Sequence, residues 1–523
     1  MKFNKKSFFR YLVLLLVIIL SFVTINVCNN KKSINIDLFG KNIKIKSSDI
    51  LEENGEYYLS YDFIKQNIDE EIYYDVVSKK VVIASDKCLL KAKINEKEVS
   101  NNFQKENVEN ICVIEKNEEE YVSLEVLEKA YDYDITKYKN TIYVSEKDYF
   151  ECIVKSNDTR MYEKSDFKSR AVNFTDTKTH LTGIMEKDGF ILVKTDDEKI
   201  GYISSKMLNY KLNVKENVEE ETKFSKYIFA DSTNQYVEKG LGVDGVMLNM
   251  FNITQKSGDV NEQKIDSSFL TSVKNNGYKV YGIVTNGYSL AGFNTTTISQ
   301  ILSDECKRLL VINNLVSYSE KYNLDGIVVD FRMIKEEDSD NFTQFIKEFN
   351  AFYTKEVVVS INAGEYKNYV KSIKYSDFSI VNFYEQRDLN SNVSGSVSEL
   401  PWMEQIIKNI IEETKASKVV ACIPSYSILW TEKNSNVVNS KVYNLSSIQD
   451  YITKNKLTKK YLENLKQNYV EFKKGSLVYR MWVEDDTSIK NRMEIIKNNK
   501  LGGVAIYKLG YENSDILSLV NIE

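Results

Sequence analysis

Two apolar segments end in polar side chains that could act on a substrate. The first, LDGIVVDFRMI (324–334), contains Asp330 and Arg332 near its end. The second, SDFSIVNFYEQRD (376–388), contains Tyr384 and Glu385 near its end. Residues two apart on a strand point to the same side, so we expect Asp330 and Arg332 to face one site. A carboxyl group can serve as a general acid or base, whereas arginine stays protonated at neutral pH and gives up no proton.

Both segments lie in a region, 226–523, where apolar strands alternate with helices. Runs such as GIVVDF and VVVSI are typical of strands buried on both faces, as in a parallel sheet covered by helices. Eight strands are expected, at 226–231, 243–252, 279–286, 324–331, 356–363, 377–384, 418–425 and 502–510. Eight such repeats over about 300 residues predict an α/β fold, a (β/α)8 TIM barrel, with its site at the carboxyl ends of the strands.

The first polar segment resembles the fourth-strand signature of family-18 glycoside hydrolases, Asp-Gly-x-Asp/Asn-x-Asp-x-Glu. Asp325, Gly326 and Asp330 match this signature. Val328 stands where the family has its first inward Asp or Asn, and Arg332 stands where it has the catalytic Glu.

Three further segments extend the resemblance over the whole region. Segment 376–388 is similar to the family's sixth strand and keeps its tyrosine as Tyr384. Segments 395–430 and 480–513 are very similar to the spore-wall-associated branch, with Tyr507 where the family usually has a tryptophan under the sugar.

The resemblance implies a retaining, substrate-assisted reaction on β-1,4 bonds next to an N-acetylated sugar. In such enzymes an Asp orients the acetamide, a Tyr holds its oxygen and a Glu protonates the departing oxygen. The resemblance assigns the first role to Asp330 and the second to Tyr384. Arg332 stands at the position of the third residue, the Glu that donates the proton. Loss of a general acid typically reduces the rate by about 10²–10⁴.

Another carboxyl could substitute for the missing acid. Glu385 follows the sixth strand where the family has a cleft Asp, and Glu336 and Glu337 follow the fourth strand. Glu385 is the best candidate of the three. Alternatively, Arg332 pairs with Asp330 or Glu385 and fills the site with a fixed ion pair, which is the arrangement we expect.

Several side chains are expected to line a sugar cleft, because relatives have similar residues there and aromatic faces pack on sugar rings. These candidates are Asn286, Trp402, Trp430, Trp482 and Tyr507. The alternative for each aromatic residue is an ordinary place in the core of the barrel.

An internal repeat precedes the barrel, within 33–149. Segments 54–85 and 117–145 each contain a strand ending in serine (Ser60, Ser123), a short amphipathic helix and an alternating strand. Serine at that place is typical of a helix N-terminus. The pattern resembles the copper amine oxidase N-terminal-like domain, an α+β spacer, although this copy contains no histidine to bind copper.

Short alternating strands fill 150–212, which resembles a small all-β Src-homology-3-like barrel. Such domains often bind cell-wall peptides, and the alternative is a spacer. A charged linker, 213–225, is expected to lead into the barrel.

The N-terminal residues 1–32 contain basic side chains followed by an apolar run at 11–27. This order predicts an uncleaved membrane anchor with the rest of the chain outside the cytoplasm. A cleaved signal is the alternative, and Cys28 leaves open a lipid anchor, although Val27 departs from lipoprotein signals.

The remaining composition excludes some functions. The net charge is −5 with both signs dispersed, so no nucleic-acid partner is expected. With one histidine, His180, and no CxxC pair, we expect no transition metal and no cofactor. Cys88 and Cys112 are either a disulfide or isolated thiols.

Three functions remain open from the sequence. The leading hypothesis is a cell-envelope protein whose inactive barrel binds N-acetylglucosamine-containing glycan such as peptidoglycan or spore cortex. The second is a weakly active glycoside hydrolase, and the third is a scaffold for other envelope proteins.

The anchor hypothesis predicts that protease added to intact, wall-stripped cells degrades the barrel, because residues after about 30 lie outside the membrane. Immunoblotting of the barrel before and after protease measures this. A barrel that stays protected, or fractionates with the cytosol, contradicts the predicted topology.

Overall fold

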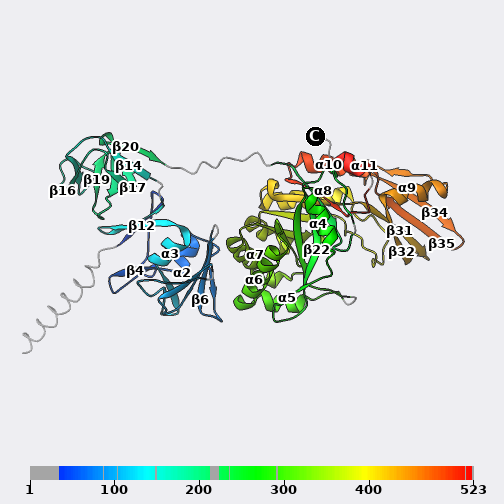
Figure 1. Ribbon diagram of the computed structural model, residues 1–523, viewed down its shortest axis with the longest axis horizontal. Coiled ribbons are helices and arrows are strands. Elements are labelled where there is room, and N and C mark those ends of the chain that lie inside the picture. Colours follow the sequence, from blue (N-terminus) through cyan, green and yellow to red (C-terminus); the bar gives the residue numbers. More distant parts are fainter. Residues whose placement is uncertain are drawn as a thin grey trace, which may run out of the picture. The chain divides into compact units, whose positions relative to one another are not determined.

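The computed structural model describes residues 34–85, 88–102, 104–147, 150–212, 223–234, 236–289, 292–512 and 514–520 (Figure 1). The predicted anchor at 1–32 and most of the predicted linker lie outside these residues. Among the helices in the described ranges, none is long and apolar enough to cross a membrane. The chain divides into two compact units, the second of which contains all of 223–520.

Eight parallel strands close into a barrel in this second unit. Their bounds are β21 (Ser225–Ala230), β22 (Gly245–Ile253), β24 (Lys279–Thr285), β27 (Gly326–Asp330), β28 (Glu356–Asn362), β29 (Phe378–Asn382), β30 (Val419–Pro424) and β36 (Gly503–Tyr507). Neighbours pair in the order β22-β24-β27-β28-β29-β30-β36-β21, and β21 pairs again with β22 to complete the circle. The predicted (β/α)8 fold is confirmed.

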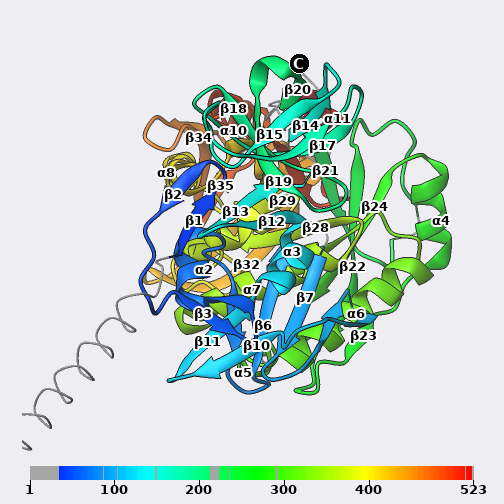
Figure 2. The same cartoon turned by 90° about the vertical axis from the view of Figure 1, so that its left-hand side faces the viewer.

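Helices cover the outside of this barrel, and Figure 2 shows α4 and α6 outside β22 and β24. Their bounds are α4 (Ser267–Asn275), α5 (Thr295–Leu302), α6 (Glu305–Lys321), α7 (Ser339–Phe352), α8 (Leu400–Glu413), α10 (Asp486–Asn498) and α11 (Ser514–Val520). Between β28 and β29 the connection consists of two 3-10 helices, η3 (Ala363–Asn368) and η4 (Val370–Tyr375).

The alternation of side chains along β27 decides what reaches the site. Ile327, Val329 and Phe331 join the apolar layer between strands and helices. Val328 joins a separate apolar cluster inside the barrel, and Asp330 follows two residues later on the same side. The strand therefore projects its last polar side chain into the mouth of the barrel.

An antiparallel sheet is inserted between β30 and β36 (Figure 1). It contains β31 (Tyr426–Lys433), β32 (Asn436–Asn444), β33 (Lys460–Leu462), β34 (Gln467–Lys474) and β35 (Leu477–Val483), together with α9 (Leu445–Lys454). This insertion was not predicted from the sequence, because its strands interrupt the strand–helix alternation that marks the barrel.

The predicted N-terminal repeat forms two matching strand–helix units. In one, β4 (Glu56–Ser60) leads into α2 (Tyr61–Asn67), and in the other, β11 (Glu119–Ser123) leads into α3 (Leu124–Tyr131). The Ser60 and Ser123 hydroxyls each accept a hydrogen bond from the backbone N–H three residues later, at 3.2 Å. Each serine therefore satisfies a backbone donor that the start of a helix leaves unpaired.

Further strands complete three small sheets around this repeat. They are β1 (Asn35–Leu38), β2 (Lys41–Ile43), β3 (Ile50–Glu53), β5 (Tyr73–Asp75), β6 (Lys80–Ser85), β7 (Cys88–Lys93), β8 (Glu98–Asn101), β9 (Gln104–Asn107), β10 (Val113–Lys116), β12 (Tyr133–Tyr138) and β13 (Thr141–Glu146). Cys112 is a buried free thiol directed at the Glu98 carbonyl, so the disulfide alternative with Cys88 is not formed.

Residues 150–212 form one antiparallel sheet, in the order β16-β15-β19-β18-β17-β14-β20. Its strands are β14 (Phe150–Val154), β15 (Thr159–Tyr162), β16 (Ala171–Thr175), β17 (His180–Lys187), β18 (Phe190–Lys194), β19 (Ile200–Ser204) and β20 (Leu208–Leu212). The all-β character agrees with the sequence, and the Src-homology-3-like resemblance stays a prediction.

Gly326, at the start of β27, provides a test of the barrel packing. An added Cβ would lie 2.6 Å from the Glu356 carbonyl oxygen and 2.8 Å from the Tyr281 ring. We expect Gly326→Ala to lower the free energy of unfolding by roughly 1–3 kcal/mol, because backbone cannot yield to the clash. Chemical denaturation measures the loss.

The control is Gly364→Ala, whose Cβ would meet only the Asn362 side-chain oxygen, at 3.3 Å. Equal stability of the two variants would contradict the close packing at the start of β27.

Candidate active site

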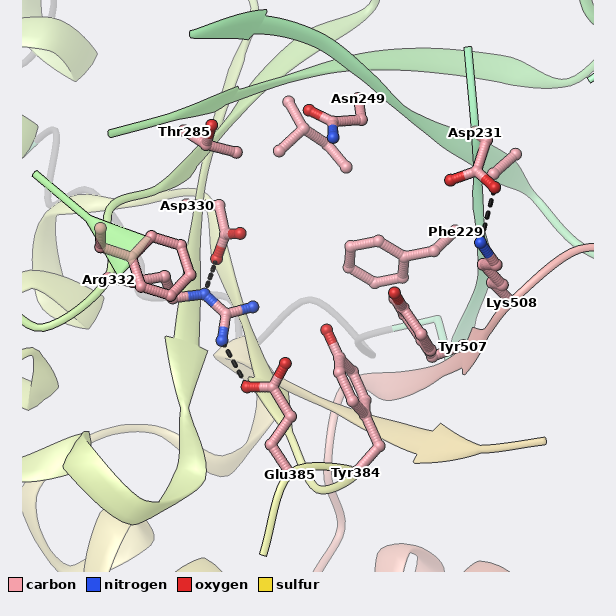
Figure 3. Close-up of a pocket in the computed structure, with 13 residues that line it drawn as sticks. Phe229, Asp231, Asn249, Thr285, Asp330, Arg332, Tyr384, Glu385, Tyr507 and Lys508 are labelled. Carbon is pink, nitrogen blue, oxygen red and sulfur yellow. Dashed lines mark hydrogen bonds and ion pairs between the residues drawn. The ribbon is translucent and has the colours of Figure 1, made fainter. Parts of the chain in front are cut away.

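A pocket of about 330 Å³ opens at the carboxyl ends of the barrel strands (Figure 3). This volume is at the lower end of the range of small-molecule sites. Its lining residues are Phe229, Ala230, Asp231, Asn249, Ile283, Thr285, Phe293, Asp330, Arg332, Tyr384, Glu385, Tyr507 and Lys508. The structure thus brings together five residues that the sequence selected: Asp330, Arg332, Tyr384, Glu385 and Tyr507.

The Arg332 guanidinium bridges two carboxylates in this pocket. Its Nε lies 2.6 Å from Asp330 Oδ1, and its Nη1 lies 2.6 Å from Glu385 Oε2. These bonds join the ends of β27 and β29, as Figure 3 shows. The side chain of Arg332 is 8% exposed, so solvent screens this pair less than a surface pair. The ion pair expected from the sequence is present, with both carboxylates at once.

Neighbouring amides hold the bridge in place. Asn286 is fully buried and uses both amide atoms on the backbone of Arg332, accepting from its N–H at 3.0 Å and donating to its carbonyl at 2.9 Å. Asn362 donates to Glu385 Oε2 at 3.0 Å. Asn286, predicted as a cleft residue, thus positions Arg332 and does not itself line the pocket.

Electrostatics keep the guanidinium charged. Burial alone lowers the pKa of Arg332, but the carboxylates of Asp330 and Glu385 outweigh burial and raise it well above its usual value. Burial raises the pKa of Glu385, while Arg332 lowers it and Asp330 raises it. Burial, with the Glu385 charge, also raises the pKa of Tyr384 well above its usual value, so its hydroxyl keeps its proton at neutral pH. Arg332 therefore cannot serve as a general acid.

Two tyrosines form an aromatic wall opposite the ion pair. The rings of Tyr384 and Tyr507 are stacked, with centroids 4.1 Å apart and planes at 18°. Phe229 lies beside Tyr507 at 5.9 Å. The stack covers one face of each tyrosine, so the two rings form a single aromatic wall of the pocket.

The three predicted tryptophans lie outside the pocket lining. Trp430 is fully buried in the core and donates to the Gly395 carbonyl at 2.8 Å. Trp402, on α8, packs against Phe383 in the outer layer of the barrel. Trp482 is half-buried on β35 and contacts Tyr469 at 5.0 Å. Trp430 and Trp402 thus occupy the core positions that were the alternative for each aromatic residue.

The other candidate acids, Glu336 and Glu337, are exposed in a 3-10 helix after β27, η2 (Glu336–Asp338), and do not line the pocket. Of the carboxyls proposed to replace the missing acid, Glu385 alone is a lining residue.

Sequence reasoning missed several lining residues. Asp231 and Lys508 form an ion pair at 2.5 Å, after β21 and β36 respectively. Thr285 is the last residue of β24, and Asn249 lies in the middle of β22, beside a register shift in its pairing with β24. A polar residue at the carboxyl end of a barrel strand is the signal that could have found Asp231, Thr285 and Lys508.

Comparison with known families decides the assignment of the second unit. Residues 225–512 match the family described as glycosyl hydrolases family 18. The chain belongs to glycosyl hydrolase family 18. Residues 37–145 also match the copper amine oxidase N-terminal domain. In the described part of the chain, no group of three or more His, Cys, Asp or Glu could hold a metal ion.

Relatives of this family-18 chain include three proteins of Bacillus subtilis strain 168. The uncharacterized glycosylase YvbX is 25% identical over 47% of this chain and 74% of its own length. The putative sporulation-specific glycosylase YdhD is 19% identical over 48% and 63%, and a cortical fragment-lytic enzyme is 20% identical over 46% and 64%. The match thus spans less than two thirds of the last two proteins.

Solved structures share the family-18 fold. The spore cortex-lytic enzyme SleL of Bacillus cereus aligns with a TM-score of 0.51 and 15% identity, covering 57% of this chain and 74% of that one. A chitinase from Chromobacterium violaceum aligns with a TM-score of 0.51 and 18% identity, covering 57% and 98%.

Replacement of Arg332 tests whether its guanidinium stabilises the two carboxylates that it bridges. We expect Arg332→Met to lower the free energy of unfolding by about 3 kcal/mol at about pH 7, because it leaves two carboxylates without their shared partner. Loss of Arg332 also raises the pKa of Glu385 further. When folding raises the pKa of a carboxyl group, the ionised group destabilises the folded state at pH values above the raised pKa. This destabilisation disappears at pH values below the pKa of the unfolded chain.

The loss of unfolding free energy in Arg332→Met should therefore become smaller as the pH falls from about 7 towards about 4. Denaturant unfolding at several pH values measures this change. Lys335→Met is the control, because Lys335 forms only an exposed pair with Glu337. A deficit for Arg332→Met that is small or independent of pH would contradict a buried bridge.

Proposed function

We propose that this family-18 protein binds N-acetylated glycan in its barrel pocket without hydrolysing it. The observation that carries the proposal is the Arg332 guanidinium, bonded to Asp330 and Glu385 beside an open pocket. The family signature places the acid at this position, and arginine gives up no proton there.

The pocket retains features that suit sugar binding. Tyr384 and Tyr507 present an aromatic wall, and Asn249 and Thr285 contribute polar side chains. The cavity is therefore a mixed apolar and polar site of the kind that binds small ligands.

The names of the relatives suggest which glycan the protein meets. A cortical fragment-lytic enzyme and the spore cortex-lytic enzyme SleL are among them. We infer that the glycan is bacterial peptidoglycan, such as that of the spore cortex, and that the barrel meets it outside the cytoplasm. A second weak contact from the Src-homology-3-like region would raise the effective concentration at the wall.

Weak hydrolysis is the second candidate, and it requires Glu385 as a relocated acid. Burial raises the pKa of Glu385, as a general acid needs, but Arg332 lowers it and occupies its Oε2. In the observed arrangement, Glu385 is the ion-pair partner of Arg332, and this pairing opposes its use as a proton donor.

The purified protein should release no more product from chitin oligomers or peptidoglycan than buffer does, because no proton donor stands at position 332. Chromatography of the reaction products measures this. Turnover that Glu385→Gln abolishes would contradict the proposal and establish Glu385 as the acid. Cleavage gained by Arg332→Glu would support the position assigned to the missing acid.

Binding should depend on the hydroxyl group of Tyr384. We expect Tyr384→Phe to weaken binding of an N-acetylglucosamine oligomer by roughly 0.5–1.5 kcal/mol, the value of a hydrogen bond between neutral groups. Titration calorimetry measures the affinity, and circular dichroism verifies folding. Trp402→Phe, outside the pocket, is the control. Absence of saturable binding to the wild-type protein would contradict glycan binding and favour a protein scaffold.

A further inference from the structure

The charges of the pocket do not cancel. Three carboxylates line it, Asp231, Asp330 and Glu385, against two cations, Arg332 and Lys508. Asp231 and Lys508 neutralise each other, whereas one guanidinium serves both Asp330 and Glu385. With all five groups ionised, the pocket carries one uncompensated negative charge.

This charge is accessible from the pocket. Asp330 and Glu385 each use one oxygen in the bridge, Oδ1 and Oε2 respectively. Their other oxygens accept no hydrogen bond from any residue that the structure describes, and Figure 3 shows both on the pocket side of the guanidinium. Two acceptors with negative charge therefore remain for a ligand.

Aromatic rings lie around the same space. Tyr384, Tyr507, Phe229 and Phe293 line the pocket, and the faces of such rings attract cations. A cationic ligand would gain from the rings as well as from the carboxylates. An anionic ligand would meet unfavourable charge.

The bridge also changes what Asp330 can bind. In the family an aspartate at this position orients the neutral acetamide, but here its Oδ1 accepts a 2.6 Å bond from a charged donor. The remaining oxygen of Asp330 can accept a bond from a neutral amide N–H or from an ammonium group. The ammonium group forms the stronger bond and adds a compensating charge.

A metal ion would be another cation for such a site. However, no cluster of three or more metal-ligating side chains exists among the residues described, and the guanidinium occupies the space between the two carboxylates (Figure 3). The geometry therefore favours an organic ammonium group, which needs fewer ligands and packs against aromatic rings.

We propose that the pocket selects a sugar with a free, protonated amine, that is, an N-deacetylated glucosamine within a glycan that is otherwise N-acetylated. This inference rests on the proposed function, because the amine is recognised as part of the glycan that the barrel binds. Glu385 then contributes to specificity, since it is one of the two carboxylates that share a single guanidinium and so give the pocket its excess negative charge.

The test compares two probes on the full chain by titration calorimetry: a β-1,4-linked glucosamine tetramer and the N-acetylglucosamine tetramer. At about pH 6, where the amine of glucosamine is protonated, the glucosamine tetramer should bind about tenfold more tightly, which corresponds to about 1.4 kcal/mol. The preference should disappear by about pH 9, because an amine beside electron-withdrawing oxygens resembles an α-amino group, with a pKa of about 8, and is largely neutral there.

Glu385→Gln should abolish this preference, because it removes one of the two carboxylate charges that share the guanidinium and keeps the shape of the side chain. Glu336→Gln, exposed on η2 and outside the pocket, is the matched control and should keep the preference. A preference that survives Glu385→Gln reflects general attraction to an acidic protein and overturns the assignment of Glu385.

The remaining outcomes separate the two proposals. Equal or tighter binding of the acetylated tetramer at about pH 6 overturns the amine inference and leaves the proposed glycan-binding function standing. Binding of neither tetramer overturns both.

Discussion

The bridge from Arg332 to Asp330 and Glu385 is the interaction on which the rest of the site depends. One cation between the ends of β27 and β29 removes proton donation from the acid position and takes one oxygen from each carboxylate. Asn286 holds the backbone of Arg332, and Asn362 holds the carboxylate of Glu385, so the bridge is part of a hydrogen-bonded network. Replacement of any member changes the others.

A fixed bridge has opposite consequences for hydrolysis and for recognition. Hydrolysis needs a proton that can leave, and the carboxylates hold the guanidinium proton more tightly than water does. Recognition needs groups that stay in place, and a side chain with 8% exposure and two ion-pair partners loses little freedom when a ligand binds. A family-18 barrel with an arginine at this position can therefore keep a well-ordered pocket.

The sequence predicted the barrel well because its signal is repeated. Eight apolar runs such as GVMLNMF are typical of strands buried on both faces, and all eight lie in the barrel sheet. The inserted sheet was missed because β32 has no buried residue and β34 has only two, so neither strand carries a clear apolar pattern. Local capping by Ser60 and Ser123 was also predictable, since it depends on neighbouring residues alone.

The site was predicted only where a motif marked it. Asp330, Arg332, Tyr384 and Glu385 follow strands with family signatures, whereas Asp231 and Lys508 meet only when β21 and β36 close the barrel. The tryptophans were harder, because composition does not tell which side of a strand or helix a ring takes. Trp430 fills the core with its indole N–H satisfied by Gly395.

A crystal structure of the protein soaked with N-acetylglucosamine tetramer would show whether the barrel binds glycan without cleaving it. We expect an unbroken oligomer in the pocket, with the Arg332 guanidinium still bonded to Asp330 and Glu385 beside an intact glycosidic bond. Two separate product fragments, or Arg332 turned away with the Glu385 carboxyl against the glycosidic oxygen, would contradict it.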